Sequence, residues 1–481
     1  MTLGLFDTAA RSVREFQPVN RGQATVYLCG ATSSGAPHLG HLRSAVCFDI
    51  LVRWLEVSGL RVTYCRNVTD IDDKILAAAA AEGVPWWSLA ERRQREFASG
   101  YALLGCRPPD AEPRATGHIP DMVALIERLL ASGHAYRRGR DVCFDISTAR
   151  DYNVLSGERP QDMLVTAEDS GHAADKRDPR DFVLWKAAKP GEPAWRAPWG
   201  AGRPGWHIEC SAMAAGYLGP EFDIHGGGQD LIFPHHENER AQSLAAGDPF
   251  ARYWVHHGLV TVTGTKMSKT AGNALAAADA LHRVRPQELR YYLGQAHYRS
   301  PVDYSPDAVQ DAAAAYRRIE RFARRAQRAS GHDGGHAADP LADPLADPVP
   351  ALNSLPISFA AAMDDDLSVP AALAAVHATV RDGNYALSTR DEESAAACLR
   401  QVRAMLAVLG LDPLAPQWAA GDPDGRLRAV VDSLVALALR QRDAARARGD
   451  YASADSIRDA LEHNGVLVED TPEGPRWELA R

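Results

Sequence analysis

Residues 25–68 read TVYLCGATSSGAPHLGHLRSAVCFDILVRWLEVSGLRVTYCRNV, and this stretch decides the fold. Its first apolar run, 26–29, is typical of a buried strand. Apolar residues then recur at helical spacing over 42–58, and a second apolar run covers 60–66. The order strand, helix, strand predicts a βαβ unit, and therefore a parallel sheet covered by helices.

The turn between the first strand and the helix carries His38-Leu39-Gly40-His41. A strand, a glycine-bearing turn and a helix N-terminus place backbone N–H groups where phosphates can bind. Past the middle of the chain, Lys266-Met267-Ser268-Lys269-Thr270 adds two mobile positive charges. Each segment alone also occurs by chance, and exposed lysines usually form a solvated surface. Together they predict a site that holds a nucleoside triphosphate from both sides while its α-phosphate is attacked.

Composition limits the class of protein. The chain has 481 residues, which suggests about three domains, and 46% of them are hydrophobic and 24% charged. We expect no membrane span and no secretory signal, and hence a cytoplasmic protein. The seven cysteines are scattered along the chain and do not resemble a disulfide framework. The net charge of −9 offers no general attraction to nucleic acid, so any contact with RNA must come from local basic surface.

The polar turn 67–74 follows the second strand, and residues 115–204 then break the α/β rhythm, as an insertion would. The rhythm resumes at 205 with a strand at 222–225, the glycines Gly226, Gly227 and Gly228, a helix over 231–246 and a strand over 254–262. Ligands of such folds gather at the carboxyl ends of the strands. The turn at 67–74 and the glycines are therefore expected to face the site.

Beyond residue 285 the pattern becomes helical. Residues 316–328 carry six arginines, which form either a local basic band or an ordinary solvated helix face. A repeated Ala-Asp-Pro-Leu stretch near 338–348 predicts a proline-stiffened linker. After it we expect helices over 357–411, a helix over 426–448, another over 451–462 and a strand over 466–470.

Four residues suit a metal ion. His235 and Glu239 are four residues apart, so on a helix they project from one face. Cys29 and Cys210 would add two thiolates, and this set of donors suits zinc. From spacing alone, core packing remains the commoner role for two such cysteines.

The segments His38–His41 and Lys266–Thr270 resemble the signature motifs of class I aminoacyl-tRNA synthetases. The stretches Gly205-Trp206-His207-Ile208-Glu209-Cys210 and Phe222 to Glu239, which ends in His235-His236-Glu237-Asn238-Glu239, are similar to the cysteinyl-tRNA synthetase family almost residue for residue. The tail, with Ala452 to Leu461 and Gly474 to Trp477, is also similar. Two departures stand out: Ser34-Gly35 replaces the family's frequent Tyr-Asp, and Thr270 replaces the usual serine.

The resemblance implies a role for each candidate residue. One Zn²⁺ per subunit is bound by Cys29, Cys210, His235 and Glu239, whereas His225 and His236 shape the pocket. ATP is bound, together with Mg²⁺, by His38, Gly40, His41, Gly227, Gly228, Asp230, Lys266 and Lys269. Of these, His38, His41, Lys266 and Lys269 are catalytic. The cysteine pocket is formed by Cys29, Thr69, Trp206 and His207. The expected reaction activates L-cysteine with ATP and transfers it to tRNA(Cys).

The resemblance implies an α/β fold with a Rossmann-like catalytic domain split by an insertion, followed by a mainly helical half with a small terminal α+β module. The expected parts are 1–114 and 205–284 (catalytic halves), 115–204 (insertion), 285–328 (stem-contact helices), 329–356 (linker), 357–424 (helical bundle) and 425–481 (anticodon module). We expect a monomer. Two alternatives stay open: a ligase that joins cysteine to an aminosugar, of the mycothiol type, and a non-catalytic paralogue that binds RNA.

Overall fold

The computed structural model describes residues 2–149, 151–157, 176–267, 277–281, 283–330, 350–420, 435, 438–446, 448–463, 466–471 and 474–479. The chain forms two compact units, Met1–Leu414 and Ala415–Arg481. The first unit contains the central sheet and most of the helices, and the second contains helices and a hairpin.

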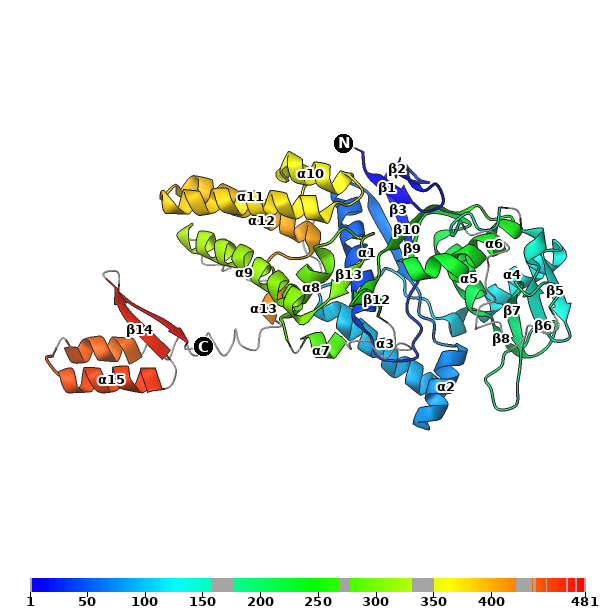
Figure 1. Ribbon diagram of the computed structural model, residues 1–481, viewed down its shortest axis with the longest axis horizontal. Coiled ribbons are helices and arrows are strands. Elements are labelled where there is room, and N and C mark those ends of the chain that lie inside the picture. Colours follow the sequence, from blue (N-terminus) through cyan, green and yellow to red (C-terminus); the bar gives the residue numbers. More distant parts are fainter. Residues whose placement is uncertain are drawn as a thin grey trace. The chain divides into compact units, whose positions relative to one another are not determined.

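The first unit is built on a four-stranded parallel sheet with the strand order β10-β9-β3-β4 (Figure 1). Its strands are β3 (Gln23–Leu28), β4 (Arg61–Arg66), β9 (Glu221–Gly228) and β10 (Phe250–His257). Helix α1 (Leu39–Val57) connects β3 to β4. The βαβ unit and the Rossmann-like parallel sheet predicted from the sequence are confirmed.

Helix α1 is apolar on nearly all sides, which is typical of a helix that is surrounded by protein. It packs against the sheet on one side and against the helical second half of the unit on the other. Three charged side chains are buried along it, namely Arg43, Asp49 and Arg53. Each of them makes polar contacts that join α1 to its neighbours.

Five more helices belong to the α/β part of this unit: α2 (Asp73–Glu82), α3 (Trp86–Leu103), α4 (Ile119–Ala131), α5 (Trp206–Leu218) and α6 (Glu237–Ala245). Between β4 and β9 the chain also forms an antiparallel sheet of β5 (Ala135–Arg138), β6 (Asp141–Phe144), β7 (Phe182–Ala187) and β8 (Gly202–Pro204). A hairpin of β1 (Gly4–Asp7) and β2 (Ser12–Glu15) begins the chain.

A second, smaller sheet lies beside the parallel one, with the strand order β12-β11-β13. It consists of β11 (Val260–Val262), β12 (Thr265–Lys266) and β13 (Val302–Tyr304). The single strand predicted over 254–262 is therefore wrong: β10 ends at His257, and the chain leaves the parallel sheet at Gly258. A Cβ atom on Gly258 would lie 2.3 Å from the Ser300 carbonyl oxygen, so the chain crosses there against another segment.

The helix predicted over 231–246 is also shorter than expected. Residues Ile232–His236 form an irregular turn, and Phe233 has extended backbone angles (φ −133°, ψ 133°). The regular helix α6 begins only at Glu237. Hence His235 lies in the turn before the helix, while Glu239 lies in its first turn.

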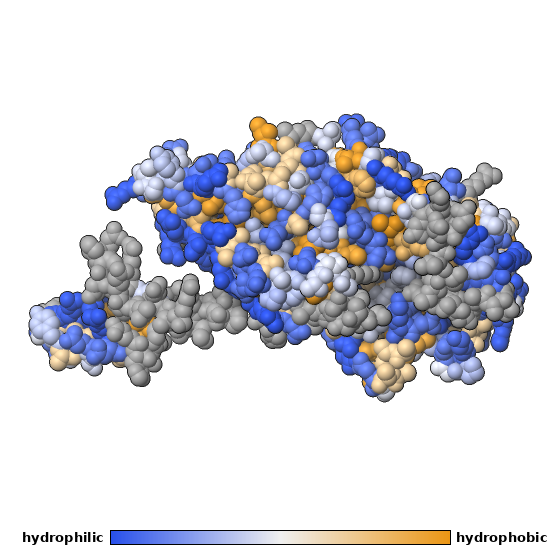
Figure 2. Space-filling view, viewed as in Figure 1, coloured by the Kyte–Doolittle hydropathy of each residue, from blue (hydrophilic) through white to orange (hydrophobic). Residues whose placement is uncertain are grey.

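The rest of the first unit is helical, as predicted: α7 (Ala277–Leu281), α8 (Pro286–Gly294), α9 (Pro306–Ala329), α10 (Ile357–Asp364), α11 (Val369–Ser388) and α12 (Glu392–Leu409). Helices α9, α11 and α12 pack side by side (Figure 1). Their apolar side chains form one continuous core with those of α1 and α8. Hydrophilic residues cover the outer surface over α9 (Figure 2).

The second unit contains α13 (Pro416–Ala420), α15 (Tyr451–His463) and a hairpin of β14 (Val466–Thr471) and β15 (Gly474–Leu479). The predicted helix over 451–462 and strand over 466–470 are confirmed. Most of the predicted linker, 331–349, and the first part of the helix expected over 426–448 lie outside the described residues. Within the described parts of the chain, no helix is long and apolar enough to cross a membrane.

Candidate active site and metal centre

A cavity of about 360 Å³ opens at the carboxyl ends of the parallel strands. Its lining comes from the ends of β3, β4 and β9, from the first turn of α1 and from the chain that follows β10. The lining includes Cys29, Ser34, His38, Gly40, His41, Arg66, Lys74, Trp206, Gly228, Asp230, His257 and Met267. This is the place where open α/β sheets bind their ligands.

The two histidines predicted for ATP form one stacked pair at the start of α1. Their ring centroids are 3.7 Å apart. The backbone N–H of Gly40 donates to His38 Nδ1, and the backbone N–H of His38 donates to His41 Nδ1, both at 3.2 Å. Because Nδ1 accepts in each ring, a neutral ring carries its proton on Nε2. Both side chains are therefore held in defined orientations at the wall of the cavity.

The glycines of β9 have different neighbours. Gly228 and Asp230, two of the residues predicted to bind ATP, line the cavity. A Cβ atom on Gly227 would lie 2.8 Å from His236 Cε1, and one on Gly226 would lie 2.1 Å from the Phe48 ring. These two glycines therefore let the strand approach a histidine and a helix closely, and Gly228 is the glycine of this group at the cavity wall.

The lysine segment is described only at its start. Lys266 is the last residue of β12, and the described residues say nothing of its side chain. Met267 lines the cavity. Ser268, Lys269 and Thr270 lie outside the described residues. The segment thus begins at the cavity whose wall also carries the histidine pair.

The four predicted metal ligands lie together in the protein interior. Their donor atoms, from Cys29, Cys210, His235 and Glu239, are all within 4.8 Å of one another, and all four residues are buried. The Sγ atoms of Cys29 and Cys210 are 3.6 Å apart, and Cys29 Sγ is 3.5 Å from Glu239 Oε1. His235 Nε2 is 3.1 Å from the same oxygen. Donors bound tetrahedrally to zinc at its usual bond lengths are roughly 3.3–3.8 Å apart, so this set fits a zinc ion.

A second group of four donors overlaps the first. It combines Cys29 and Glu239 with His225 and His236. His225 Nε2 lies 3.0 Å from Glu239 Oε2 and 3.8 Å from Cys29 Sγ. His236 also bonds through Nδ1 to His256 Nε2 at 2.8 Å. The interior can thus hold a metal in either of two ways, one with two sulfur donors and one with two imidazoles.

Burial controls the protonation of these donors in the absence of a cation. Burial raises the pKa of the Cys29 and Cys210 thiols and of the Glu239 carboxyl group. Burial also lowers the pKa of His225 to about 3. Burial therefore favours the neutral form of these groups in the protein alone, and a divalent cation competes with protons for the thiols and the carboxyl group.

The predicted cysteine pocket is split between two layers. Cys29 and Trp206 line the cavity, and the Trp206 ring stacks on the His235 ring with centroids 4.0 Å apart. His207 is buried and its Nδ1 lies 2.9 Å from His235 Nδ1. Thr69 is buried too, and its carbonyl oxygen accepts from the Ser33 N–H at 3.0 Å. His207 and Thr69 therefore support the residues that face the cavity.

Sequence reasoning did not single out Arg66 or His257, which line the cavity, whereas Lys74 belongs to the turn 67–74 that was expected to face the site. Arg66 pairs with Glu112 at 2.8 Å and lies 4.4 Å from the centre of the Tyr101 ring. The Lys74 ammonium lies 5.4 Å from the centre of the Trp206 ring. Their position at or just after the end of a strand is the signal that could have identified Arg66 and His257.

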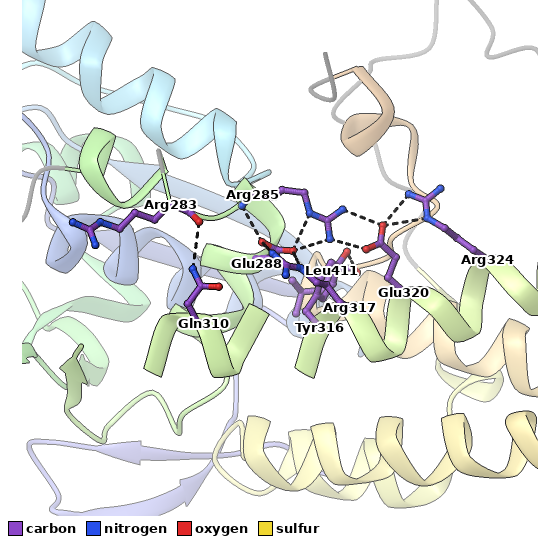
Figure 3. Close-up of polar contacts among 9 residues, drawn as sticks. All are labelled: Arg283, Arg285, Glu288, Gln310, Tyr316, Arg317, Glu320, Arg324 and Leu411. Carbon is purple, nitrogen blue, oxygen red and sulfur yellow. Dashed lines mark hydrogen bonds and ion pairs between the residues drawn. The ribbon is translucent and has the colours of Figure 1, made fainter. Parts of the chain in front are cut away.

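The arginines of α9 lie on its exposed face, and two of them are paired with carboxylates (Figure 3). Arg317 Nε donates to Glu288 at 2.7 Å, and Arg324 Nη2 donates to Glu320 at 2.8 Å. Arg285 bridges both carboxylates. The basic surface predicted for this helix is thus in part a network that joins α9 to α8.

Three family models match the chain. They are the tRNA synthetases class I (C) catalytic domain over residues 15–314, the DALR domain over 358–414 and the cysteinyl-tRNA ligase anticodon binding domain over 434–477. The first and second matches lie within the first compact unit, and the third lies within the second unit.

Full-length relatives and solved structures agree with these matches. A cysteine–tRNA ligase of Streptomyces avermitilis is 53% identical over 481 residues, 100% of this chain and 99% of that protein. The enzyme of the same name from Streptomyces griseus is 52% identical with the same coverage. Methionyl-tRNA synthetase of Mycobacterium tuberculosis, solved with methionyl-adenylate, has a TM-score of 0.58 at 18% identity and covers 85% of this chain and 96% of its own. At that identity the structure supports the shared fold only.

Proposed function

The chain belongs to the cysteine–tRNA ligase family of class I synthetases, and from this premise we propose how its own residues activate cysteine and which of them bind zinc. The observation that carries the proposal is the position of Cys29. This residue lines the cavity proposed for ATP and is also one of the four buried donors, so the donor cluster adjoins the cavity.

We assign the zinc ion to Cys29, Cys210, His235 and Glu239. Two thiolates, an imidazole and a carboxylate form a softer donor set than the alternative with one thiolate, and soft donors favour zinc. His207 supports the assignment because it bonds to Nδ1 of His235 and leaves Nε2 of His235 toward Glu239. Such an outer hydrogen bond fixes the orientation of a ligating imidazole.

When bound, the zinc would favour a thiolate over a neutral hydroxyl and so separate cysteine from serine. A pocket without this chemistry separates such similar side chains poorly. The Trp206 ring lies against His235 and also lines the cavity, next to the donor Cys29. The side chain of cysteine would thus lie near Cys29, with its carboxylate toward the histidine pair.

ATP, with Mg²⁺, is proposed to occupy the cavity between the histidine pair and the start of the lysine segment. His38, Gly40 and His41 face it from α1, and Gly228 and Asp230 face it from the end of β9. Lys266 and Lys269 would add charge to the phosphates, and Gly227 would shape the strand next to them. Catalysis is expected from alignment and charge stabilisation, as the cysteine carboxylate attacks the α-phosphate.

The acceptor is proposed to be tRNA(Cys), with contacts from the exposed arginines of α9 and from the second unit. The anticodon binding match over 434–477 supports a tRNA acceptor rather than an aminosugar. The cavity and the donor cluster are both present among the described residues, which argues against a non-catalytic paralogue. We propose that the enzyme acts as a monomer in the cytoplasm, where such a reaction supplies protein synthesis.

Cysteine-dependent exchange of pyrophosphate into ATP, followed by charging of purified tRNA, tests this function. The full chain loaded with zinc should exchange pyrophosphate with cysteine and not with serine, and should then charge tRNA. Exchange without charging, together with transfer to an aminosugar, would favour the aminosugar ligase. Absence of exchange would contradict the proposal.

A further inference from the structure

Arg43 is a buried arginine two residues after His41 on α1. Its guanidinium group donates to five backbone carbonyl oxygens and uses all three of its nitrogens. The acceptors are Gly258 (3.1 Å), Leu293 (2.7 Å), His297 (3.2 Å), Tyr298 (3.2 Å) and Ser300 (2.6 Å). The side chain thus bonds the start of α1 to two segments that are distant from it in the sequence.

Both segments lie at the base of the small sheet. Gly258 is the residue at which the chain leaves β10 for β11, and the segment 297–300 leads into β13. Strand β11 pairs with β13 on one side and with β12, which ends in Lys266, on the other. Arg43 therefore holds the base of the sheet that carries the start of the lysine segment.

The two segments also contact each other closely. The N–H of Gly258 donates to the Tyr298 carbonyl at 2.7 Å, and the N–H of Val302 donates to the Leu259 carbonyl at 2.9 Å. A Cβ atom on Gly258 would lie 2.3 Å from the Ser300 oxygen. There is no space for a side chain here, so a shift of either segment moves the other.

Segment 297–300 is also anchored by Asp366, on the side of the turn between α10 and α11. The Tyr298 hydroxyl donates to Asp366 Oδ1 at 2.6 Å, and Arg299 Nε donates to Asp366 Oδ2 at 2.7 Å. Because the segment is fixed from that side, Arg43 sets the distance between it and α1.

We propose that Arg43 is a positioning residue for ATP: it fixes the spacing between the histidine pair on α1 and the end of β12, at which the lysine segment begins. This inference rests on the proposed function. Groups that bind phosphates from two sides act together only if their separation is held, and a misplacement of about 1 Å can lower the rate about 100-fold. Arg43 acts through the backbone carbonyls of Gly258 and of segment 297–300.

The same helix supplies a matched control. Arg53 is equally buried, and it donates to Asp49 (2.8 Å), the Ala407 carbonyl (3.2 Å) and the Gly105 carbonyl (3.2 Å). These contacts join the other end of α1 to α12 and to the chain after α3. A change at Arg53 therefore disturbs a buried arginine of α1 without touching the base of the small sheet.

The test is pyrophosphate exchange by the zinc-loaded full chain, with ATP and cysteine varied separately, for Arg43→Lys, Arg53→Lys and Gly258→Ala. A lysine keeps the charge but has only three N–H donors on one nitrogen. We expect Arg43→Lys to raise KM for ATP about tenfold, the equivalent of one lost hydrogen bond to a charged group, while KM for cysteine and the zinc content stay unchanged. Arg53→Lys should lower the melting temperature and change neither KM.

Gly258→Ala should reproduce the effect from the opposite side of the contact, because its new methyl group displaces Ser300. It decides the question if Arg43→Lys does not fold. An unchanged KM for ATP in the folded variants, an equal rise of both KM values, or the same effect from Arg53→Lys would overturn the inference. Absence of exchange in the unchanged chain would instead contradict the proposed function.

Discussion

At the scale of single residues, Cys29 belongs both to the cavity proposed for ATP and to the candidate metal centre. It directly follows β3, lines the cavity and belongs to both groups of metal donors. The two groups differ in their other members, which are Cys210 with His235, or His225 with His236. Because the groups share Cys29 and Glu239, a change at either shared residue removes both and cannot distinguish them. The informative substitutions are at the residues that differ.

We predict that Cys210→Ala and His235→Ala bind zinc more than about 100-fold more weakly, since even the loss of an outer hydrogen bond usually costs 10- to 100-fold. Both variants should lose cysteine-dependent exchange together with the metal. His225→Asn, which alters the other group, should retain most of its zinc. Competition with a chromophoric chelator measures the affinity. Retention of zinc by Cys210→Ala with loss from His225→Asn would assign the metal to the second group.

At the scale of helices, a buried ion cluster joins α1 to α8. Asp49 on α1 accepts from Arg53 at 2.8 Å and from Arg290 of α8 at 2.5 Å. Arg290 also donates at 2.9 Å to the carbonyl of Leu409, the last residue of α12. Burial alone would raise the pKa of Asp49, but the two arginine charges and the Arg107 N–H lower it well below its usual range.

Asp49→Asn should destabilise the first unit by about 3–5 kcal/mol near pH 7, because it leaves two arginines buried without their carboxylate. The folded-state pKa is lowered, so the stabilisation is complete above the unfolded value of about 3.9 and declines as the pH falls through the folded value. The difference from the unchanged chain should therefore shrink by about 1.4 kcal/mol for each pH unit below about 3.9. Chemical denaturation between pH 7 and pH 3 measures it. A difference that stays constant over this range would show that the Asp49 charge is not responsible.

A second network joins α8 to α9, nearer the surface (Figure 3). The Glu288 carboxylate on α8 is buried and accepts from Arg317 Nε at 2.7 Å and from the Arg285 N–H at 3.0 Å. Burial would raise the pKa of Glu288, but Arg317 and Arg285 lower it. Because both arginines are partly exposed, solvent screens the interaction in part.

Glu288→Gln keeps the shape and removes the charge, and we expect it to destabilise the first unit by about 1–2 kcal/mol, a value reduced for solvent screening. The control is Glu82→Gln, which removes an exposed carboxylate that pairs with Arg93 at 3.0 Å. The melting temperature of Glu82→Gln should match that of the unchanged chain. Equal melting temperatures for both variants would mean that the α8–α9 network contributes no stability.

Local patterns in the sequence were sufficient for the βαβ unit, because the period of its apolar residues changes from strand to helix within one stretch. They also placed His235 and Glu239 on one side of the chain, although Phe233 breaks the helix before His235. They failed where the structure depends on distant contacts. The chain leaves the parallel sheet at Gly258 because Gly258 packs against Ser300, and no local pattern predicts that contact. The role of Arg43 was missed for the same reason, since its acceptors lie more than 200 residues away in the chain.

At the scale of the whole molecule, the two compact units divide the chemistry. Every described residue of the cavity and of the donor cluster belongs to Met1–Leu414. The match to an anticodon binding domain lies in Ala415–Arg481. An amino acid and ATP are small enough to be bound by the first unit alone, whereas tRNA is long enough to be bound by both units. Activation of cysteine and recognition of tRNA should therefore be separable.

A chain that ends at Leu414 should exchange pyrophosphate with cysteine at a rate close to that of the full chain, since its cavity and donors are complete. Its kcat/KM for charging tRNA should fall about 100-fold, because two linked contacts bind far more tightly than one, and this advantage disappears with the second unit. Adding residues 415–481 as a separate chain should restore little, since the linkage is what raises the effective concentration. Circular dichroism and thermal unfolding check that the shortened chain is folded. Full charging by the shortened chain would show that the second unit contributes no binding energy for tRNA, and loss of exchange by a folded shortened chain would show that the site needs both units.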